Sequence, residues 1–432
     1  MIKFEQFIGS DTFRLIEKLG FWLSLFGLLR LIVCLGFVFE DGRGIVVLDS
    51  FDFESAGTDG YIQLAKTWLE TGKYAYFKDS FPVHTRPPVT AWIMKFVAAP
   101  YPTYWYWGWF SFTIALFTVA SLLFFLTISV RISAVFVRRF ILISYLLFPP
   151  LLASVRAATF LPIGVAVITC WAVAVYWMFQ KKDIFWVLIV VVLAIIAALT
   201  HATLVLLFPV SLWGIWSLDS PLKKRIISLL IFCTVFFAGI FPWTLRNYQQ
   251  FHQFIPIASG AGAQYWKGEE SIFGTTDIIF TVYQKKYGKK LNITYFGTDT
   301  PQQDNELWKL ATDDMLQNPA KLLERIVRGA FLFWFPNDSF PMKRTLLLLL
   351  NLPWIIWWLS RSIQILRKQF LQPLFLFCVF MWAAFAFFGA EASYYVMLLP
   401  LIWLQIGFSY EKKSLFSIKN FTTEAINPKI PK

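Results

Sequence analysis

Several acidic side chains lie in one segment, residues 40–103, between two long apolar runs of the chain. Asp59 stands just before a stretch in which apolar residues recur at helical spacing. An aspartate at such a position commonly caps a helix by accepting backbone N–H bonds. The same carboxylate, held near a membrane surface, could instead act as a general base or bind a metal ion. Asp49, Asp52 and Glu54 are rivals in the same segment, and spacing alone does not separate them.

Three arginines are candidates for binding a phosphate group. Arg86 stands in His84-Thr-Arg-Pro-Pro88 and Arg246 in Pro242-Trp-Thr-Leu-Arg-Asn247, whereas Arg156 carries less weight. A guanidinium group near a membrane either extends to a lipid headgroup or binds a phosphate through its planar fork. The residue types leave both roles open.

Aromatic and imidazole groups near these residues complete the candidate set. Tyr61 and His84 are further candidates for substrate binding. We interpret His84, His201 and His252 as single interfacial histidines, since no spacing brings carboxylates to them in a metal-binding pattern. No cofactor is therefore expected with certainty, and a divalent metal stays open.

Transmembrane helices must position these residues. Hydrophobic residues make up 57% of the 432 residues and charged residues 15%, compared with about 25% charged in soluble domains. Several apolar runs reach the roughly 17 to 25 residues that cross a bilayer as a helix. We therefore predict an all-α polytopic membrane protein with about ten spans. They lie near residues 21–39, 104–130, 140–155, 160–179, 184–200, 202–218, 226–243, 345–360, 371–389 and 394–409.

Basic residues mark alternate junctions between these runs, and such junctions are expected to be cytoplasmic. They are Arg131, Arg138, Arg139, Lys181, Lys182, Lys223, Lys224, Arg225, Arg361, Arg367, Lys368, Lys412 and Lys413. Both termini, residues 1–20 and 411–432, are then cytoplasmic and flank a transmembrane domain of residues 21–410. The net charge of +13 belongs mostly to the inner face, where anionic lipid explains it without a nucleic acid partner. The four cysteines fall inside predicted spans, so no disulfide is expected.

Two long segments, residues 40–103 and 244–344, interrupt the hydropathy pattern, and the charge rule places both outside. In the first, an amphipathic helix is predicted from Asp59 to about Gly72, and residues 88–99 are a second interfacial candidate. Neither helix is long and apolar enough to span. Both are expected to lie at the membrane interface.

The second long segment begins directly after a predicted span, at Phe241 to Tyr248. A glycine-rich nucleotide-binding loop follows a strand and precedes a helix. Gly260 and Gly262 follow no predicted strand and precede no clear helix, so they are a weak signal for such a loop. The far end of the segment, residues 318–331, is predicted to be a helix that Asn318 caps, with a proline in the first turn. A segment of this length is usually functional or separately folded.

Two groups of short motifs follow one another in a distinctive order along the chain. The first group is Thr58-Asp-Gly-Tyr-Ile-Gln-Leu-Ala65, Gly72-Lys-Tyr74 and Arg86-Pro-Pro88. The second is Pro242-Trp-Thr-Leu-Arg-Asn247, Phe254-Ile-Pro-Ile257, Gln317-Asn-Pro-Ala320 and Tyr394-Tyr-Val-Met-Leu-Leu-Pro400. This order resembles the GT-C membrane glycosyltransferases, in particular the branch of protein mannosyltransferases and aminoarabinose transferases. The resemblance extends from about residue 20 to residue 410.

This resemblance implies an inverting transfer of a sugar from a polyprenyl phosphate to a glycan, lipid or protein acceptor. The reaction would take place on the periplasmic side of a bacterial inner membrane. Asp59 corresponds to the first-loop acidic residue of the family and Arg86 to the basic residue beside the paired prolines. Many relatives carry further acids where this chain has Gly60 and Arg156-Ala-Ala-Thr159, so metal dependence is not implied.

Chemistry that follows from the residues themselves agrees with this implication. A leaving phosphate develops negative charge that a guanidinium group can stabilise, while a carboxylate takes the acceptor's proton. Two other classes of function stay open. A secondary transporter would place ionisable residues in mid-membrane, where the predicted spans hold almost none beyond Arg30. A non-catalytic lipid-binding or assembly protein would use Asp59 only as a helix cap.

Overall fold

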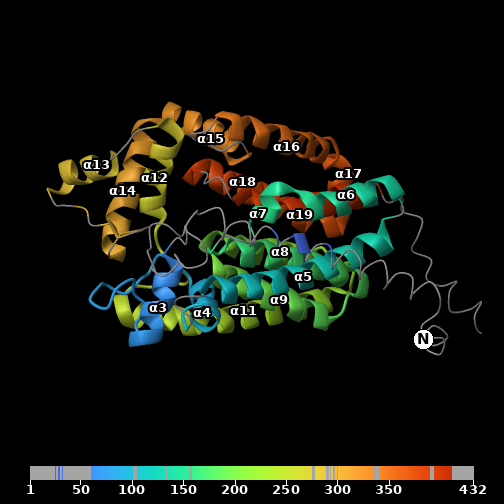
Figure 1. Cartoon of the computed structure of the whole chain (residues 1–432), viewed down its shortest axis with the longest axis horizontal. Helices are drawn as coiled ribbons and strands as arrows, with labels where there is room; N and C mark the ends of the chain where they lie inside the picture. Colours follow the sequence, from blue (N-terminus) through green and yellow to red (C-terminus); the bar gives the residue numbers. More distant parts are fainter. Residues whose placement is uncertain are drawn as a thin grey trace, which may run out of the picture.

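The computed structural model of this chain is built almost entirely from helices (Figure 1). It describes residues 60–100, 105–132, 134–154, 158–274, 278–288, 291, 293–294, 297–298, 300–334, 341–389 and 394–410, together with Leu25, Leu28, Leu29 and Ile32. Within these residues the only paired strands are β1 (Ile293–Thr294) and β2 (Gly297–Thr298), which pair antiparallel. The prediction of an all-α fold is confirmed.

The long helices form two layers (Figure 1). The lower layer contains α5 (Trp105–Arg131), α8 (Leu161–Lys181), α9 (Ile184–Thr200) and α11 (Leu222–Phe251). The upper layer contains α6 (Val135–Leu147), α16 (Pro341–Ser360), α18 (Gln372–Phe388) and α19 (Leu399–Ser409). Short elements connect them: α7 (Pro149–Ser154), η3 (Ala202–Leu206), α10 (Leu207–Trp216), α17 (Ser362–Leu366), η4 (Gln369–Leu371) and η5 (Tyr394–Met397).

Helix α8 is the central element of the packing. It is apolar on nearly all sides and contacts α5, α9 and α19, so most of its side chains are buried. A helix that is hydrophobic all round belongs in the interior of such an assembly. The main apolar core therefore lies between the two layers and around α8.

Among the residues that the structure describes, four helical segments are long and apolar enough to cross a membrane, by length and composition. They are Trp105–Ser129, Leu161–Lys181, Leu222–Phe251 and Gln369–Phe388. Shorter apolar helices occupy several other predicted spans, and the predicted span at 140–155 is divided between α6 and α7. The division falls at Pro149 because a proline cannot continue the hydrogen bonding of the preceding helix. Of the predicted first span, only four residues are described, and all four are helical.

Both helices predicted in the first long segment are present, as α3 (Tyr61–Thr71) and α4 (Pro88–Val97). Helix α3 ends at Gly72, whose backbone has φ 72° and donates its N–H to Trp68 O. At the other end Gly60, and not Asp59, is the N-cap residue. Asp59, Asp49, Asp52 and Glu54 lie outside the described residues.

Helix α11 extends well beyond the predicted end of its span at residue 243. It continues through Pro242 to Phe251. Residues 255–257 explain this extension, because their carbonyl groups accept hydrogen bonds from three α11 side chains. Trp243 Nε1 donates to Ile257 O at 2.6 Å, Thr244 Oγ1 to Pro256 O at 2.8 Å and Asn247 Nδ2 to Ile255 O at 3.0 Å. Arg246 is therefore helical and does not lie in a loop.

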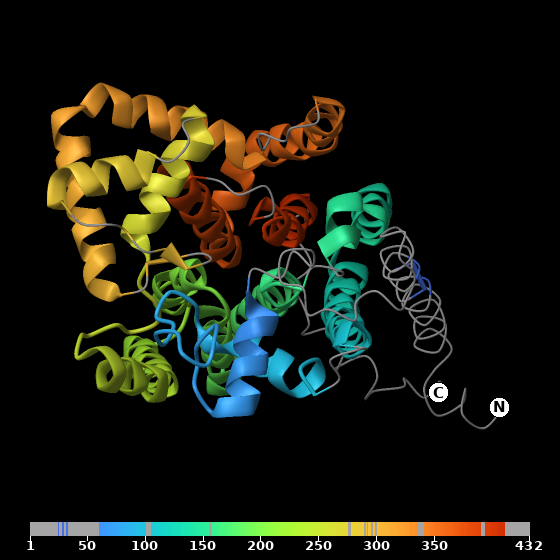
Figure 2. The same ribbon diagram turned by 60° about the vertical axis from the view of Figure 1, so that its left-hand side comes forward.

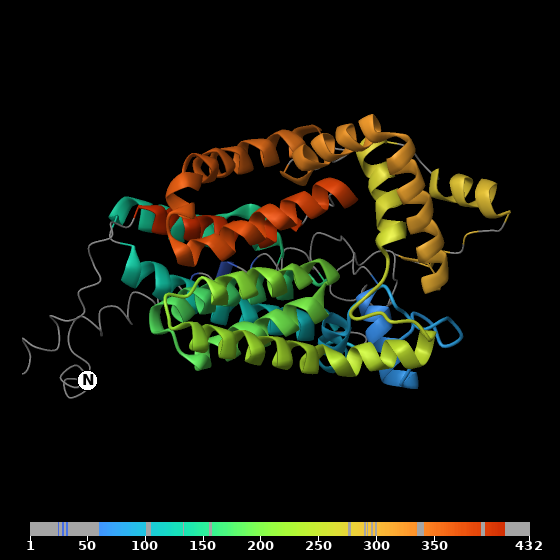
Figure 3. The ribbon, with the colours of Figure 1, turned by 180° about the vertical axis from the view of Figure 1, so that it is seen from behind.

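The second long segment folds into α12 (Ala261–Phe273), α13 (Ile278–Tyr287), α14 (Pro301–Gln317) and α15 (Pro319–Trp334). Figures 2 and 3 show α12, α13 and α14 beyond one end of the two layers. They share a small core of their own, formed by Ala263, Tyr265, Trp266, Ile279, Tyr283, Leu291, Leu307, Leu310 and Ala311. The predicted helix at 318–331 is confirmed as α15. The prediction that no helix follows Gly260 was wrong, because α12 begins at the next residue.

Candidate functional site

Arg86 lies in the short non-helical turn that leads into α4. Its side chain is 8% exposed, and its guanidinium carbon lies 5.4 Å from the centre of the Tyr61 ring. Two prolines follow Arg86. Because the residue before a proline avoids helical backbone angles, Arg86 is not part of helix α4. The Tyr74 hydroxyl donates to Arg86 O at 3.3 Å and to Pro87 O at 3.0 Å, and these hydrogen bonds fix the backbone of the turn.

Tyr61 is the first residue of α3 and is fully buried beside Arg86. The helix can begin there because Gly60 adopts φ 75°, a left-handed conformation that glycine tolerates best. A Cβ atom at Gly60 would also lie 2.6 Å from Cε1 of Tyr76. The chain therefore needs glycine at this position and has no room for a second acidic residue there.

Tyr74 lies between the two candidate arginines of the site. Burial raises the pKa of Tyr74 well above its usual value, with Tyr61 and Tyr76 adding to the effect. The positive charges of Arg246 and Arg86 oppose this rise, so both guanidinium groups act on the same hydroxyl. The guanidinium carbon of Arg246 lies 5.4 Å from the Tyr74 ring centre. The two arginines, distant in sequence, thus meet at one tyrosine.

Most of the hydrogen bonds that the Arg246 guanidinium group donates go to acceptors within the protein. Its Nη1 donates to Val83 O at 3.0 Å and to Asn247 Oδ1 at 2.9 Å, and its Nη2 donates to Tyr74 O at 3.4 Å. The guanidinium group also packs on the Trp243 ring at 4.9 Å. These contacts fasten the turn that follows α3 to the C-terminal end of α11. They account for the position of Arg246 without a phosphate ligand.

His84 joins the two long segments. Its Nε2 lies 2.9 Å from Thr298 O, which can only accept, so Nε2 carries a proton. Its Nδ1 lies 2.6 Å from Ser259 Oγ, and Ser259 N donates to His84 O at 3.0 Å. The side chain is 1% exposed. His84 therefore holds the segments in contact, and both ring nitrogens are engaged in doing so.

His201 is a member of this site that the sequence gave no reason to select. It lies at the junction of α9 and η3, where Nδ1 accepts from Thr203 N and faces Thr203 Oγ1 at 2.8 Å. Nε2 lies 3.3 Å from the Tyr394 hydroxyl, and the ring packs on Phe160 with 4.0 Å between ring centres. Burial, assisted by the charge of Arg86, lowers the pKa of His201 to about 3. The imidazole is therefore neutral beside the guanidinium group.

The candidates Asp59 and Arg156 lie outside the described residues, so the structure does not place their side chains. Their described neighbours do belong to the site. Asp59 immediately precedes Gly60 and Tyr61, while Arg156 precedes Phe160, whose ring packs on His201. Among the described residues, no group of three or more histidine, cysteine, aspartate and glutamate side chains could hold a metal ion.

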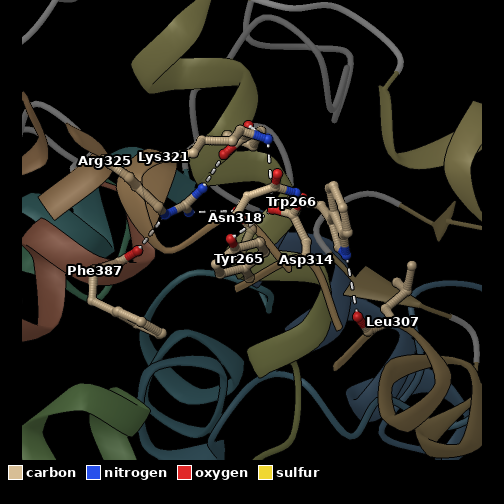
Figure 4. Close-up of polar contacts among 9 residues, drawn as sticks. Tyr265, Trp266, Leu307, Asp314, Asn318, Lys321, Arg325 and Phe387 are labelled. Carbon is tan, nitrogen blue, oxygen red and sulfur yellow. Dashed lines mark hydrogen bonds and ion pairs between the residues drawn. The ribbon is translucent and has the colours of Figure 1, made fainter. Parts of the chain in front are cut away.

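A second polar cluster, drawn in Figure 4, lies within the second long segment. Arg325 is paired with Glu269 at 2.5 Å and donates to Tyr265 O at 2.6 Å and to Phe387 O at 2.7 Å. Lys321 also pairs with Glu269, at 2.5 Å. Because Phe387 belongs to α18, this cluster fastens the second segment to the upper layer. Its groups satisfy one another, which indicates a structural role.

The N-terminus of α12 is also occupied by the protein's own charge. Asp304 accepts from Gly260 N at 2.8 Å and from Ala263 N at 2.9 Å, and its side chain is 3% exposed. Burial raises the pKa of this carboxyl group, although four backbone N–H groups oppose the change. A carboxylate thus fills the place that a phosphate would take at a helix N-terminus. Gly262 allows α12 to approach α14 closely, since a Cβ atom at this position would lie 2.3 Å from Asp304 O.

Comparison with known proteins adds no family to these observations. No family model matches the chain, and neither curated proteins nor solved structures gave a match. The site itself brings together Arg86, Tyr61, Tyr74 and His201 from separate parts of the sequence.

Proposed function

We propose that this protein is an inverting glycosyltransferase of a bacterial inner membrane. It transfers a sugar from a polyprenyl phosphate to an acceptor on the outer, periplasmic side. The observation that carries this proposal is the buried Arg86, which packs on Tyr61 at the start of α3 and lies near the neutral His201. A cation in this setting is suited to a phosphate leaving group, and the candidate base Asp59 is two residues from Tyr61 in the sequence.

Arg86 stabilises the leaving phosphate in this proposal. As the bond between the anomeric carbon and the phosphate oxygen breaks, the electron pair and negative charge pass to the phosphate. A guanidinium group presents two parallel N–H donors to such an oxyanion, and a buried setting strengthens the interaction. His201 adds no second positive charge, because its low pKa keeps it neutral. Arg86 is thus the cation that responds to the developing charge.

Asp59 completes the reaction as the general base. It accepts the proton of the acceptor hydroxyl while that oxygen attacks the anomeric carbon opposite the leaving phosphate, which gives inversion. A carboxylate positioned for this transfer typically contributes about 10² to 10⁴ in rate. These steps are written without a metal ion, and a divalent metal stays a candidate cofactor.

Arg246 takes a positioning role in this proposal. Its hydrogen bonds to Tyr74 O and Val83 O hold the turn that carries Arg86 against α11. The two arginines therefore have different roles in this proposal, although the sequence makes both of them candidates for binding a phosphate. Arg86 binds the phosphate, and Arg246 fixes the segment from which Arg86 extends.

Membrane placement suits a donor that is insoluble in water. We propose that the helical layers span the bilayer, with both long segments on the outer side and both termini in the cytoplasm. Direct contact between the two segments, through His84 and Ser259, agrees with their lying on the same side. Helices α3 and α4 then lie at the interface beside the site, where a lipid donor can enter sideways from the bilayer. The acceptor is a glycan, a lipid or a protein hydroxyl.

A donor-turnover experiment tests the proposal. Purified protein is incubated with polyprenyl-phosphate sugars, and release of polyprenyl phosphate is followed with and without membrane glycans, lipids and proteins as acceptors. The proposal expects acceptor-dependent release. A secondary transporter in vesicles would move a solute without cleaving the donor, and a non-catalytic lipid-binding protein would retain the donor unchanged.

Sidedness is tested separately by labelling an engineered cysteine. Ser271 is exposed on α12, so Ser271→Cys is introduced into a chain lacking Cys34, Cys170, Cys233 and Cys378. A membrane-impermeant thiol reagent should reach it from the outside of intact cells. Labelling only from the cytoplasmic side would overturn the proposed placement of the site.

A further inference from the structure

An open groove lies between the N-terminal ends of α9 and α11. Its volume is about 450 Å³, and its lining residues are Ile184, Pro221, Lys223, Lys224, Ile227 and Ser228. This volume falls within the roughly 300 to 1,000 Å³ of common ligand pockets. The wall of the groove is almost entirely apolar, yet two lysines belong to its lining. The groove is thus apolar inside, and the two lysines are the only charged residues among those that line it.

The two lysines of the groove differ from the neighbouring basic residues Lys182 and Arg225, whose charged groups contact other groups of the protein. Lys182 pairs with Asp219 at 2.8 Å, and Arg225 donates to Trp216 O at 3.1 Å. Lys223 and Lys224 are both exposed, and in the described part of the chain neither forms an ion pair. A ligand of this groove should therefore carry negative charge at one end.

The surface beside the groove is strongly apolar. Phe185 on α9 and Leu230 on α11 are 60% and 62% exposed, and Ile227 in the groove itself is 44% exposed. A water-soluble anion would bind the lysines and leave these side chains uncovered. A phospholipid satisfies both requirements, because its phosphate reaches the lysines while an acyl chain covers the apolar wall.

We propose that this groove binds an anionic phospholipid of the cytoplasmic leaflet. The proposal rests on the membrane placement given above, in which the Lys223–Lys224 junction is cytoplasmic. It is independent of the glycosyl transfer, since the groove belongs to the opposite membrane face from Arg86. Bound lipid would hold the inner ends of α9 and α11 together at the leaflet boundary.

Native mass spectrometry of the full-length protein tests the proposal. Detergent-solubilised protein is titrated with phosphatidylglycerol and, separately, with phosphatidylcholine of the same acyl chains. The wild type should retain phosphatidylglycerol preferentially. Lys223→Gln/Lys224→Gln should weaken that retention about 10- to 30-fold, as expected for two surface cations that face anionic lipid. Lys285→Gln/Lys286→Gln on α13 removes the same charge from another exposed site and should leave retention unchanged.

Two additional arms separate lipid binding from simple anion binding. Ile227→Gln keeps both lysines but makes the groove polar, so it should also weaken retention of phosphatidylglycerol. Glycerol phosphate at the same concentration should not displace the lipid. Equal retention of the two lipids by the wild type, unchanged retention in the Lys223→Gln/Lys224→Gln variant, or displacement by glycerol phosphate would each overturn the proposal. Because none of these arms measures sugar transfer, their failure leaves the proposed enzymatic activity untouched.

Discussion

Arg86 and Arg325 are both buried arginines, and both belong to segments that the charge pattern places outside the membrane, but their surroundings differ. Arg325 is 1% exposed on helix α15, where Glu269 and two backbone carbonyl groups receive its donors. Arg86 is 8% exposed in a turn, with its guanidinium group packed on the face of Tyr61. Arg325 is thus enclosed by helices α12 and α18, whereas Arg86 lies in the connection between α3 and α4.

The difference separates a structural cation from a candidate binding cation. Glu269 neutralises Arg325 inside the protein, and breaking such a buried pair leaves a charge without compensation. Arg86 instead packs on Tyr61 and lies near Tyr74 and His201, in the turn that the functional proposal makes the phosphate site. Substitution at Arg325 should therefore damage stability, whereas substitution at Arg86 should damage function.

The largest effect is expected from Asp59→Asn, which tests whether the Arg86 region is catalytic at all. Asparagine keeps the size and most of the capping ability of aspartate but cannot accept a proton as a base. Sugar transfer should fall about 10²- to 10⁴-fold. Loss of a cap alone would change stability by about 1 kcal/mol and leave transfer largely intact.

The matched control for this variant is Asp52→Asn, assayed for transfer and thermal stability in the same preparation. Transfer that survives Asp59→Asn but disappears with Asp52→Asn would move the base to Asp52. If both variants transfer sugar normally, the site is a lipid-binding site without catalysis.

Arg325→Met tests the structural side of the comparison. It leaves Glu269 buried with only Lys321 as a partner, so the free energy of unfolding should fall by about 3 kcal/mol. Thermal or denaturant unfolding in detergent measures this loss. Arg328→Met is the control, because Arg328 pairs with Glu324 on the exposed surface of the same helix and such pairs contribute less than about 1 kcal/mol. Equal losses in the two variants would remove the distinction drawn for Arg325.

Arg86→Lys tests the binding side. Lysine retains the charge but lacks the planar fork that binds a phosphate through two parallel bonds. Transfer should fall about 10²-fold, which is the lower end of the effect seen when one donor to a developing oxyanion is lost. Stability should change little compared with Arg325→Met. A variant with normal transfer and reduced stability would show that Arg86 is a second structural cation.

The smallest effect concerns the pH dependence of stability at His201. Its pKa is about 3 in the folded protein and 6.5 in the reference state, so the unfolded chain binds more protons between these values. Stability should therefore be lost as the pH falls below 6.5, by up to about 1.4 kcal/mol for each pH unit. His201→Gln should remove this part of the dependence in thermal unfolding at pH 7.5 and 5.5. His252→Asn, at an exposed histidine, should retain it, and identical slopes in the wild type and His201→Gln would contradict the burial argument.

Local sequence patterns determined the helical elements. Helix α3 was predicted with its end at Gly72, α4 with its start at the paired prolines, and α15 with its start at Pro319, and all three are present. These features are local, because capping residues and apolar periodicity act within one or two helical turns. The same patterns located most of the apolar helices within a few residues.

Only the tertiary structure decided where α11 ends and where α12 begins. Helix α11 continues past Pro242 because carbonyl groups of residues 255–257 accept bonds from its side chains. Helix α12 begins after Gly260 because Asp304, 44 residues away in sequence, accepts its first N–H groups. No local pattern contains these partners.

The composition of the site was likewise a tertiary result. Arg86 was selected from its motif, but nothing in the sequence linked it to His201, which reaches it from the junction of α9 and η3. Arg246 was selected as a phosphate ligand, yet the carbonyl groups of Tyr74 and Val83 take up its donors. Sequence spacing indicates which groups can do chemistry, but the partners that occupy or neutralise those groups come from distant segments and are settled only when the helices pack together.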